Sequence, residues 1–229
     1  MRPLLVLRPE PGNAETIARA EALGVSALSF PLFAAASIAW KAPSSDDFDA
    51  ILLTSANAIR MAGHGLNSLR KLPAYCVGEA TAIAAQAAGL SVALIGQSGV
   101  DQLLAQSGNK HVLHLCGEDR IAPKPTGATI TPLACYRMDE LPARSELLET
   151  LKQNPVALLH SPRAARHFAS LVDISSSSRS AISLCALSPA VADAAGVGWE
   201  DVAISPNPRD DEFLYVANSH FKFTTKASE

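Results

Sequence analysis

Short apolar runs alternate along the chain with alanine-rich stretches in which apolar residues recur at helical spacing. Apolar runs of strand length that alternate with helices predict a parallel sheet covered by helices on both faces. Gly24 and Gly89 directly follow two of the predicted helices, a position where glycine commonly ends a helix. The predicted strands are 4–7, 25–30, 50–53, 74–77, 91–95, 156–159, 182–187 and 201–204, and the predicted helices are 13–23, 56–64, 80–88, 162–171 and 190–195.

The two halves of the chain repeat one pattern of residues. Any α/β chain has some similarity with itself, but the shared positions of Ser, Gly and Arg favour a duplication. Two copies of one α/β unit would form two similar domains with a cleft between them. The aligned pairs are ILLTSANAIR (51–60) with ALLHSPRAAR (157–166), YCVGEATAIAAQAAGLSVAL (75–94) with LCALSPAVADAAGVGWEDVAI (184–204), LLVLRPE (4–10) with VLHLCGE (112–118), and the Pro-Leu strands SFPLF (29–33) with ITPLAC (130–135).

The composition is that of a folded protein without a general affinity for polyanions. Of the 229 residues, 48% are hydrophobic and 18% are charged, which suffices for a packed core. The net charge of -3 gives no overall attraction to nucleic acid or to anionic membranes. The apolar run before Arg8 is too short for a signal peptide or a membrane span. We therefore expect a soluble, cytoplasmic protein with no nucleic-acid partner and no membrane partner.

No spacing of residues in the chain indicates a metal site or a cofactor site. His111 and His114 are three positions apart, which on a strand puts them on opposite faces. The chain has no P-loop, HExxH or GxSxG motif, and GVG at 196–198 lacks the third glycine of a dinucleotide site. The cysteines, which are expected to be buried, reduced thiols, are Cys76, Cys116, Cys135 and Cys185. We therefore expect no metal and no cofactor.

Short polar turns follow several of the predicted strands and precede helices. In an open parallel sheet such turns lie at the carboxyl edge, where ligands bind, and helix N-termini there favour a carboxylate or a phosphate. Helix capping is the ordinary explanation for any single serine in such a turn, and a solvated surface charge is the ordinary explanation for an arginine. Four similar turns with arginines near equivalent strand ends favour a site for a polyanion. The candidate binding residues are Arg8, Thr54, Ser55, Gly117, Arg120, Ser161, Arg163 and Ser188.

Tyr136 is one of three tyrosines and directly follows a predicted strand. A half-buried structural tyrosine is the ordinary explanation for this position. A phenol with a reference pKa near 10 stays protonated at neutral pH, so Tyr136 could instead donate a proton in a cleft. Both explanations remain open at the level of the residues.

Several motifs in one order resemble those of the uroporphyrinogen-III synthase family. No single motif is specific, but the ordered set extends over nearly the whole chain. The motifs are LTSANA (53–58), YCVGEATA (75–82), HLCGEDR (114–120), ITPLACYRM (130–138), LLHSPRAARHF (158–168), LSPAVADA (187–194) and SPNPRDDEFL (205–214).

The resemblance implies two similar parallel-sheet α/β domains, doubly wound and flavodoxin-like, joined by a two-stranded connection with a ligand cleft between them. The chain would start in the first domain, cross to the second and return along the two Pro-Leu strands. The implied first domain is 1–34 plus 138–229, and the implied second domain is 38–133. The family also implies a monomer. No role is evident for the last stretch, 221–229.

The family's activity is the cyclisation of hydroxymethylbilane, a linear tetrapyrrole polycarboxylate, to uroporphyrinogen III with loss of water and inversion of the last pyrrole ring. The resemblance therefore implies a cofactor-free lyase of tetrapyrrole (haem) biosynthesis whose partner is this small-molecule substrate. It makes Tyr136 the catalytic residue, on the family's cleft tyrosine, and Thr81 a substrate-binding residue. One departure is Ser188-Pro189-Ala190-Val191, because the family's second turn usually carries Gly and Thr. No threonine hydroxyl is available at that turn.

Two other functions fit the same pattern. A non-catalytic two-domain protein that closes on a small anion would have the same fold and the same turns, so only turnover separates it from the enzyme. A duplicated Rossmann-like oxidoreductase or transferase is disfavoured by the missing glycine fingerprint.

Overall fold

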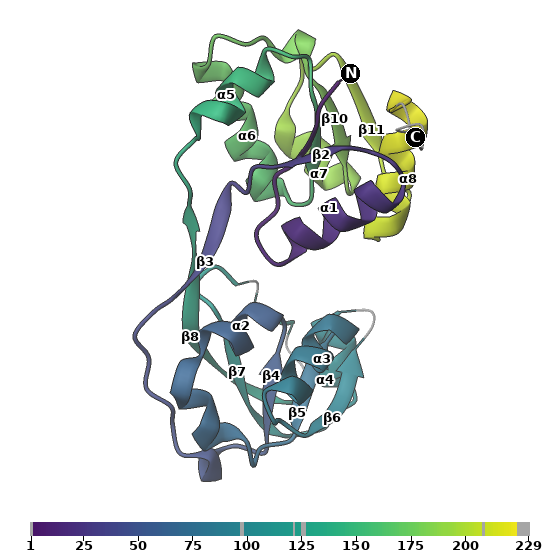
Figure 1. Ribbon diagram of the computed structural model, residues 1–229. Coiled ribbons are helices and arrows are strands. Elements are labelled where there is room, and N and C mark those ends of the chain that lie inside the picture. Colours follow the sequence, from purple (N-terminus) through teal and green to yellow (C-terminus); the bar gives the residue numbers. More distant parts are fainter. Residues whose placement is uncertain (1, 97–98, 121, 125–126, 208, 224–229) are drawn as a thin grey trace. The chain divides into compact units, whose positions relative to one another are not determined.

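The chain folds into two compact units, and its path passes from one to the other twice (Figure 1). The structure is a computed structural model that describes residues 2–96, 99–120, 122–124, 127–207 and 209–223. Unit 1 is Met1–Ala34 with Glu140–Glu229, and unit 2 is Ala35–Asp139.

Two neighbouring strands carry the chain between the units. The N–H of Ile38 donates to the carbonyl of Cys135 at 3.1 Å, and the N–H of Leu141 donates to the carbonyl of Leu32 at 2.9 Å. Residue numbers rise along one strand as they fall along the other, so the two strands are antiparallel. The crossing strands are β3 (Phe33–Ser37) and β8 (Thr129–Glu140).

Unit 1 is built on a five-stranded parallel sheet in the order β11-β10-β9-β1-β2. Numbered along the chain within the unit, this order is 5-4-3-1-2, the flavodoxin-like arrangement seen from one side. The strands are β1 (Leu4–Val6), β2 (Ala27–Ser29), β9 (Val156–Leu159), β10 (Ser183–Ala186) and β11 (Asp201–Ile204).

Helices cover both faces of the unit 1 sheet (Figure 1). Leu4 and Val6 pack with Ala20 of α1 and Phe213 of α8 on one face. The alternate residue Leu5, which is also fully buried, turns to the other face. On that face α6 contacts β9 and α7 contacts β10. The helices are α1 (Gly12–Ala22), α5 (Ser145–Leu151), α6 (Pro162–Ile174), the 3-10 helix η3 (Arg179–Ala181), α7 (Pro189–Ala195) and α8 (Asp210–Phe221).

Unit 2 holds a six-stranded sheet in the order β3-β8-β7-β4-β5-β6. The strands from β8 to β6 are parallel, and β3 is the antiparallel edge strand. The strands not yet named are β4 (Ala50–Leu53), β5 (Ala74–Val77), β6 (Val92–Gly96) and β7 (His111–Gly117).

The central strand β4 divides its side chains between two cores. Ile51 and Leu53 pack on the face covered by α2, η2 and α3, whereas Ala50 and Leu52 pack on the face covered by α4. All four side chains are fully buried, which explains why the sequence of β4 is continuously apolar. The helices are η1 (Ser45–Asp47), α2 (Ala56–Met61), η2 (Gly63–Leu69), α3 (Glu79–Ala87) and α4 (Val100–Ala105).

The strands that the sequence repeat aligns occupy the same places in the two sheets. The order β2-β1-β9-β10-β11 matches β8-β7-β4-β5-β6 position by position, with β1 on β7 and β9 on β4. The copy in unit 2 is circularly permuted, because its chain starts at β4 and ends at β8. In each sheet the strand order reverses between the second and third positions, and we call this place the switch point. It lies between β1 and β9 in unit 1 and between β7 and β4 in unit 2.

The structure shortens or divides several predicted elements. The helix predicted over 56–64 ends as an α-helix at Met61, because Gly63 takes a φ of +58° and the chain continues as η2. The strand predicted over 25–30 is strand only at β2. The predicted Pro-Leu strand at 29–33 is divided between β2 and β3, since Pro31 offers no N–H for a ladder. The helices predicted from the hydrophobic pattern omit α4, α5 and α8, and residues 224–229 of the last stretch lie outside the described residues.

The four cysteines are free and buried, as the sequence predicts. Burial raises the pKa of Cys76 to about 11 and that of Cys185 to about 12. Within the described residues, no three His, Cys, Asp or Glu side chains gather closely enough to hold a metal ion. No helix in the described part of the chain is both long and apolar enough to cross a membrane.

Candidate functional site

A pocket of about 360 Å³ lies at the carboxyl edge of the sheet in unit 2. It sits at the switch point, where the ends of β4 and β7 meet, and ligands of doubly wound sheets bind at this place. The pocket brings together five of the predicted residues: Thr54, Ser55, Gly117, Arg120 and Tyr136. It is also lined by Val77, Val100, His114, Cys116 and Asp119.

Tyr136 lies against the backbone of Gly117. A bulge after Cys116 shifts the register of β7 and β8 so that Gly117 pairs with Tyr136, and the N–H of Glu118 donates to the carbonyl of Tyr136 at 2.9 Å. A Cβ atom on residue 117 would lie 2.8 Å from Cζ of the tyrosine ring, closer than side chains approach one another. Position 117 is therefore glycine because the ring of Tyr136 occupies the space of a side chain.

The phenol of Tyr136 remains protonated at neutral pH. Burial raises the pKa of Tyr136 above its usual value, and a hydrogen bond with the side chain of Ser55 offsets this shift only in part. The Oγ of Ser55 also accepts the N–H of Asn57 at 3.2 Å and so caps α2, as the sequence predicts. The capping serine thus fixes the helix start and the position of the phenol together.

His114 is a pocket residue that the sequence reasoning missed. Its Nε2 lies 3.0 Å from Oγ1 of Thr54, and its side chain is 2% exposed. Burial, and then the charge of Arg120, lower the pKa of His114 to about 4, so the ring is neutral at neutral pH. A signal was present in the repeat, because His114 aligns with Val6 and a polar residue stands where the other copy has a core residue.

The mouth of the pocket carries charges of both signs. Among the described lining residues, Arg120 supplies the positive charge and Asp119 the negative charge. Arg120 is exposed, and its charge also opposes the rise that burial causes in the pKa of Cys116. An exposed guanidinium beside a protonated phenol suits a carboxylate ligand.

Thr81 lies outside the set of residues that line this pocket. It stands in the first turn of α3, after Gly78, whose φ of +82° suits glycine. The side chain of Thr81 is 5% exposed. Its role in substrate binding stays a prediction from the resemblance.

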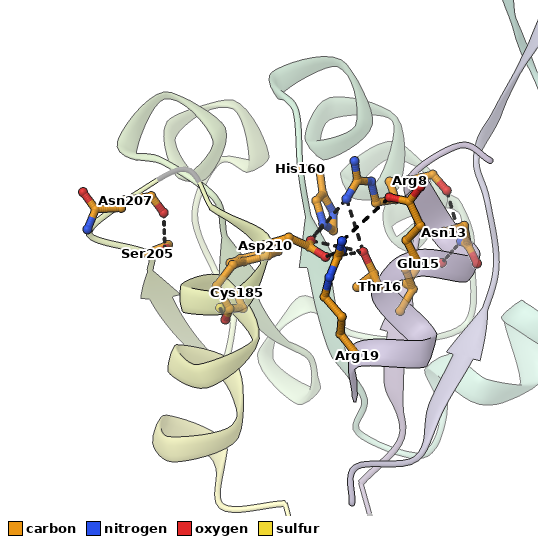
Figure 2. Close-up of polar contacts among 12 residues, drawn as sticks. Arg8, Asn13, Glu15, Thr16, Arg19, His160, Cys185, Ser205, Asn207 and Asp210 are labelled. Carbon is orange, nitrogen blue, oxygen red and sulfur yellow. Dashed lines mark hydrogen bonds and ion pairs between the residues drawn. The ribbon is translucent and has the colours of Figure 1, made fainter. Parts of the chain in front are cut away.

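The switch point of unit 1 is filled by the unit's own carboxylate. Figure 2 shows Asp210, at the start of α8, surrounded by Arg8, Thr16, Arg19 and His160. Oδ1 of Asp210 accepts from Nη1 of Arg8 at 3.2 Å and lies 3.1 Å from Nε2 of His160. Oδ2 accepts from Nη1 of Arg19 at 2.5 Å and from the hydroxyl of Thr16 at 3.0 Å. Arg8 follows β1 and His160 follows β9, so the carboxylate occupies the place that the pocket has in unit 2.

The surroundings of Asp210 keep it ionised. Burial alone would raise the pKa of Asp210, but hydrogen bonds from His160, Thr16 and Arg19 outweigh it and hold the pKa at about 2. Burial lowers the pKa of His160, and its hydrogen bond to Asp210 offsets this shift in part. Arg8, a predicted substrate-binding residue, is thus engaged inside unit 1.

The other predicted residues of unit 1 lie at helix starts. Oγ of Ser161 accepts the N–H of Ala164 at 3.2 Å and caps α6. The capping role predicted for the side chain of Ser188 is wrong, because the N–H of Val191 donates to the backbone carbonyl of Ser188 at 3.0 Å instead. Cζ of Arg163 lies 4.6 Å from the centroid of the Phe33 ring, a cation–π contact.

Comparisons with known proteins agree with this architecture. The chain matches the family model described as uroporphyrinogen-III synthase HemD over residues 14–214. It is similar to a solved uroporphyrinogen-III synthetase from Helicobacter pylori, with 16% identity, a TM-score of 0.66, and coverage of 96% of this chain and 100% of that chain. It is also similar to a mutant uroporphyrinogen III synthase from Thermus thermophilus, with 16% identity, a TM-score of 0.50, and coverage of 97% and 99%. No curated protein matches the chain by sequence.

The solved structures share only 16% identity with this chain, so the likeness to them establishes a shared fold and nothing beyond it. The family model extends over most of the chain and includes the unit 2 pocket and Asp210, whereas β1 and Arg8 lie before the matched residues. The chain therefore belongs to the uroporphyrinogen-III synthase family, the cyclising lyases of tetrapyrrole biosynthesis.

Proposed function

We propose that the unit 2 pocket binds hydroxymethylbilane and that Tyr136 acts there as the catalytic acid. The observation that carries this proposal is the phenol of Tyr136, which is protonated at neutral pH and lines a pocket at the switch point beside Arg120. A polycarboxylate with a hydroxymethyl leaving group needs an anion site and a proton donor close together. The residues of this pocket supply both.

In this proposal the substrate carboxylates bind to short polar groups around the pocket. The hydroxyls of Thr54 and Ser55, the backbone at Gly117 and the guanidinium of Arg120 are the contacts. Binding distributed over backbone and side-chain groups means that most single substitutions have mild effects. The other predicted contacts stay predictions: those of Ser161, Arg163 and Ser188 come from the polar turns, and that of Thr81 comes from the resemblance. Arg8 is already bound by Asp210, so we do not include it among the contacts.

The reaction begins with loss of the terminal hydroxyl. Tyr136 gives its proton to this hydroxyl, which leaves as water, and an electrophilic azafulvenium cation remains. The substituted carbon of the last pyrrole attacks this cation to form a spiro intermediate, and cleavage and reclosure leave that ring inverted. Recovery of the pyrrole's aromaticity releases one proton, which restores the phenol. The net change is the loss of one water molecule.

Most of the catalysis in this scheme is positioning. The linear tetrapyrrole closes readily without an enzyme, but without inversion of the last ring. An enzyme that holds the bent conformation needed for the spiro intermediate therefore changes the product more than it changes the bond-breaking chemistry. Acid help from Tyr136 adds to this effect.

The proposal includes a monomer that works in the cytoplasm and binds no nucleic acid. The net charge of -3 supports the absence of a nucleic-acid partner, and the family resemblance supports the monomer. Light scattering coupled to size exclusion tests the oligomeric state directly, and a dimer mass would contradict it.

An isomer analysis tests the function. Hydroxymethylbilane is generated in place, the protein is added, and the products are oxidised and separated into type I and type III isomers. The expected result is a shift from the spontaneous type I product to type III. Unchanged type I product from a folded protein would overturn the catalytic proposal and favour the anion-binding alternative.

A further inference from the structure

His114 is a buried polar side chain whose hydrogen-bond partner is a pocket residue. Its Nε2 lies 3.0 Å from Oγ1 of Thr54, and the whole residue is 2% exposed. Its second nitrogen, Nδ1, is buried and has no hydrogen-bond partner among the residues that the structure describes. The two nitrogens therefore have different surroundings, and these decide where the ring proton lies.

The neutral ring carries its proton on Nε2. A proton on Nδ1 would be a buried N–H donor without an acceptor, and such orphaned donors are rare in folded proteins. A proton on Nε2 is shared with Oγ1 of Thr54 and leaves only a lone pair unpaired at Nδ1. The second hydrogen bond of a histidine generally determines its tautomer in this way.

The direction of the hydrogen bond determines what the Thr54 hydroxyl can do. A hydroxyl has one hydrogen to donate and lone pairs to accept with. Because Oγ1 of Thr54 accepts from His114, its own hydrogen points elsewhere, and Thr54 is half-buried and lines the pocket. The hydroxyl can therefore donate to a ligand in the pocket.

We propose that His114 is a positioning residue, which donates from Nε2 to Thr54 and turns the Thr54 hydroxyl into a donor for a substrate carboxylate. This inference rests on the function proposed for the pocket. It assigns Thr54 to the recognition of acceptor groups, which are the carboxylates of a linear tetrapyrrole rather than its pyrrole N–H groups.

The repeat argues against a purely structural role for His114. The aligned position in unit 1 is Val6, which is fully buried on β1, and the position aligned with Thr54 is His160. The same sheet thus forms around an apolar residue at this position. The polar pair occurs in the unit whose switch point is an open pocket.

Steady-state kinetics of matched variants test the proposal. His114→Leu and Thr54→Val should each raise KM about tenfold, the effect of losing one hydrogen bond to a charged group, and change kcat little. His114→Gln places an amide nitrogen near the position of Nε2 and should recover most of the affinity. His111→Leu is the control, because His111 lies on the same strand but bonds Thr131 outside the pocket lining.

A double-mutant cycle shows whether His114 acts through Thr54. In the Thr54→Val background, His114→Leu should raise KM no further, because the hydroxyl it orients is gone. Full additivity of the two effects would overturn the inference. A KM for His114→Leu equal to that of the wild type, in an enzyme that makes type III product, would overturn it too and leave the proposed function intact.

Nitrogen-15 spectroscopy of the wild-type protein reads the tautomer without any variant. The expected spectrum shows His114 neutral at neutral pH with its proton on Nε2. A proton on Nδ1 would contradict the inference even if the apolar variant failed to fold. Failure of the wild type to make type III product would instead contradict the proposed function, so the two failures are distinguishable.

Discussion

The two units place very different groups at the same position of the same strand order. At the switch point of unit 2 lies a pocket of about 360 Å³ with Tyr136 and Arg120 in its lining. At the switch point of unit 1 lies the carboxylate of Asp210, which four side chains from three parts of the unit bind (Figure 2). A duplicated fold therefore offers the anion-binding edge twice, and this chain closes one copy with its own side chain.

The comparison teaches that a cationic cluster at a sheet edge is no sufficient sign of a substrate site. The sequence predicts similar roles for Arg8 and Arg120, since both lie near equivalent strand ends. The difference is the partner: Arg8 binds Asp210 from α8, whereas Arg120 is exposed at the mouth of a pocket. At neutral pH we therefore expect substitutions in the Asp210 cluster to change stability and substitutions in the lining of the unit 2 pocket to change kinetics.

The largest effect should follow from Asp210→Ala. Breaking a partly buried ion pair leaves Arg8, Arg19 and His160 without their carboxylate, and we expect a loss of about 3 kcal/mol in the free energy of unfolding. The chain has two tryptophans, one in each unit, so denaturant unfolding followed by Trp199 fluorescence in a Trp40→Phe background reports on unit 1.

The neighbouring residue provides the control for this prediction. Asp211 is exposed and pairs with the exposed Arg209, so Asp211→Ala should change the unfolding of unit 1 little. An equal loss in both variants would mean that the start of α8 matters and the Asp210 cluster does not.

The next largest effect concerns acid and unit 2. The folded-state pKa of His114 is about 4, below the usual 6.5, because burial disfavours the charged ring. Between these two pH values the unfolded chain binds a proton that the folded protein does not bind. The fold therefore has its full stability above pH 6.5 and loses stability as the pH falls towards 4. Between pH 6.5 and 4.5 we expect the wild type to lose about 2 kcal/mol relative to His114→Gln, at roughly 1.4 kcal/mol per pKa unit. Trp40 fluorescence in a Trp199→Phe background measures this difference, and parallel pH profiles would contradict it.

A smaller effect, on turnover, should follow from Tyr136→Phe. Because the substrate ionises readily without help, loss of the phenol should lower kcat only about tenfold, less than general acid catalysis usually contributes, and leave type III as the product. Full turnover of a folded Tyr136→Phe protein would refute the acid role. Tyr215, which is 69% exposed, supplies the matched control Tyr215→Phe, with unchanged kcat.

Gly117→Ala tests the role of Tyr136 by a second route, because it displaces the phenol ring without removing the hydroxyl. The added Cβ would meet the Tyr136 ring at 2.8 Å, so the ring must move. We expect a fall in kcat similar to that of Tyr136→Phe, and no further fall when the two changes are combined, because both act on the same phenol. Additive losses would show that Gly117 contributes through its own backbone.

The strands and the polar turns of both units could be predicted from the sequence, because both depend on local residues. β4 and β9 are continuously apolar and a capping serine, Ser55 or Ser161, follows each of them after one further residue, so the sequence predicts their bounds to the residue. The helices α4 and α5 have apolar residues at helical spacing, but each extends for only about two turns. A helix of two turns contains too few apolar residues for its spacing to be distinguished from that of a loop.

The contacts of Asp210 and His114 could not be predicted from local pattern. Asp210 is far from Arg8 and His160 in the sequence and meets them only once α8 packs on the sheet. The sequence shows three acidic residues at the start of α8, and the fold decides which one turns inward. For His114 the repeat offered a clue, but the partner Thr54 is set by the register of β4 and β7.

The smallest effects should come from the two arginines, and they test the comparison itself. Arg120→Gln removes one exposed charge from the pocket mouth. It should raise KM about threefold, because an exposed ion pair with a substrate carboxylate contributes little, and it should leave the stability at neutral pH unchanged. Arg8→Gln should do the reverse: Trp199-reported stability falls while KM stays near that of the wild type, because Asp210 already takes the guanidinium. A raised KM for Arg8→Gln would mean that a substrate carboxylate displaces Asp210, and the closed switch point of unit 1 would then be a second part of the binding site.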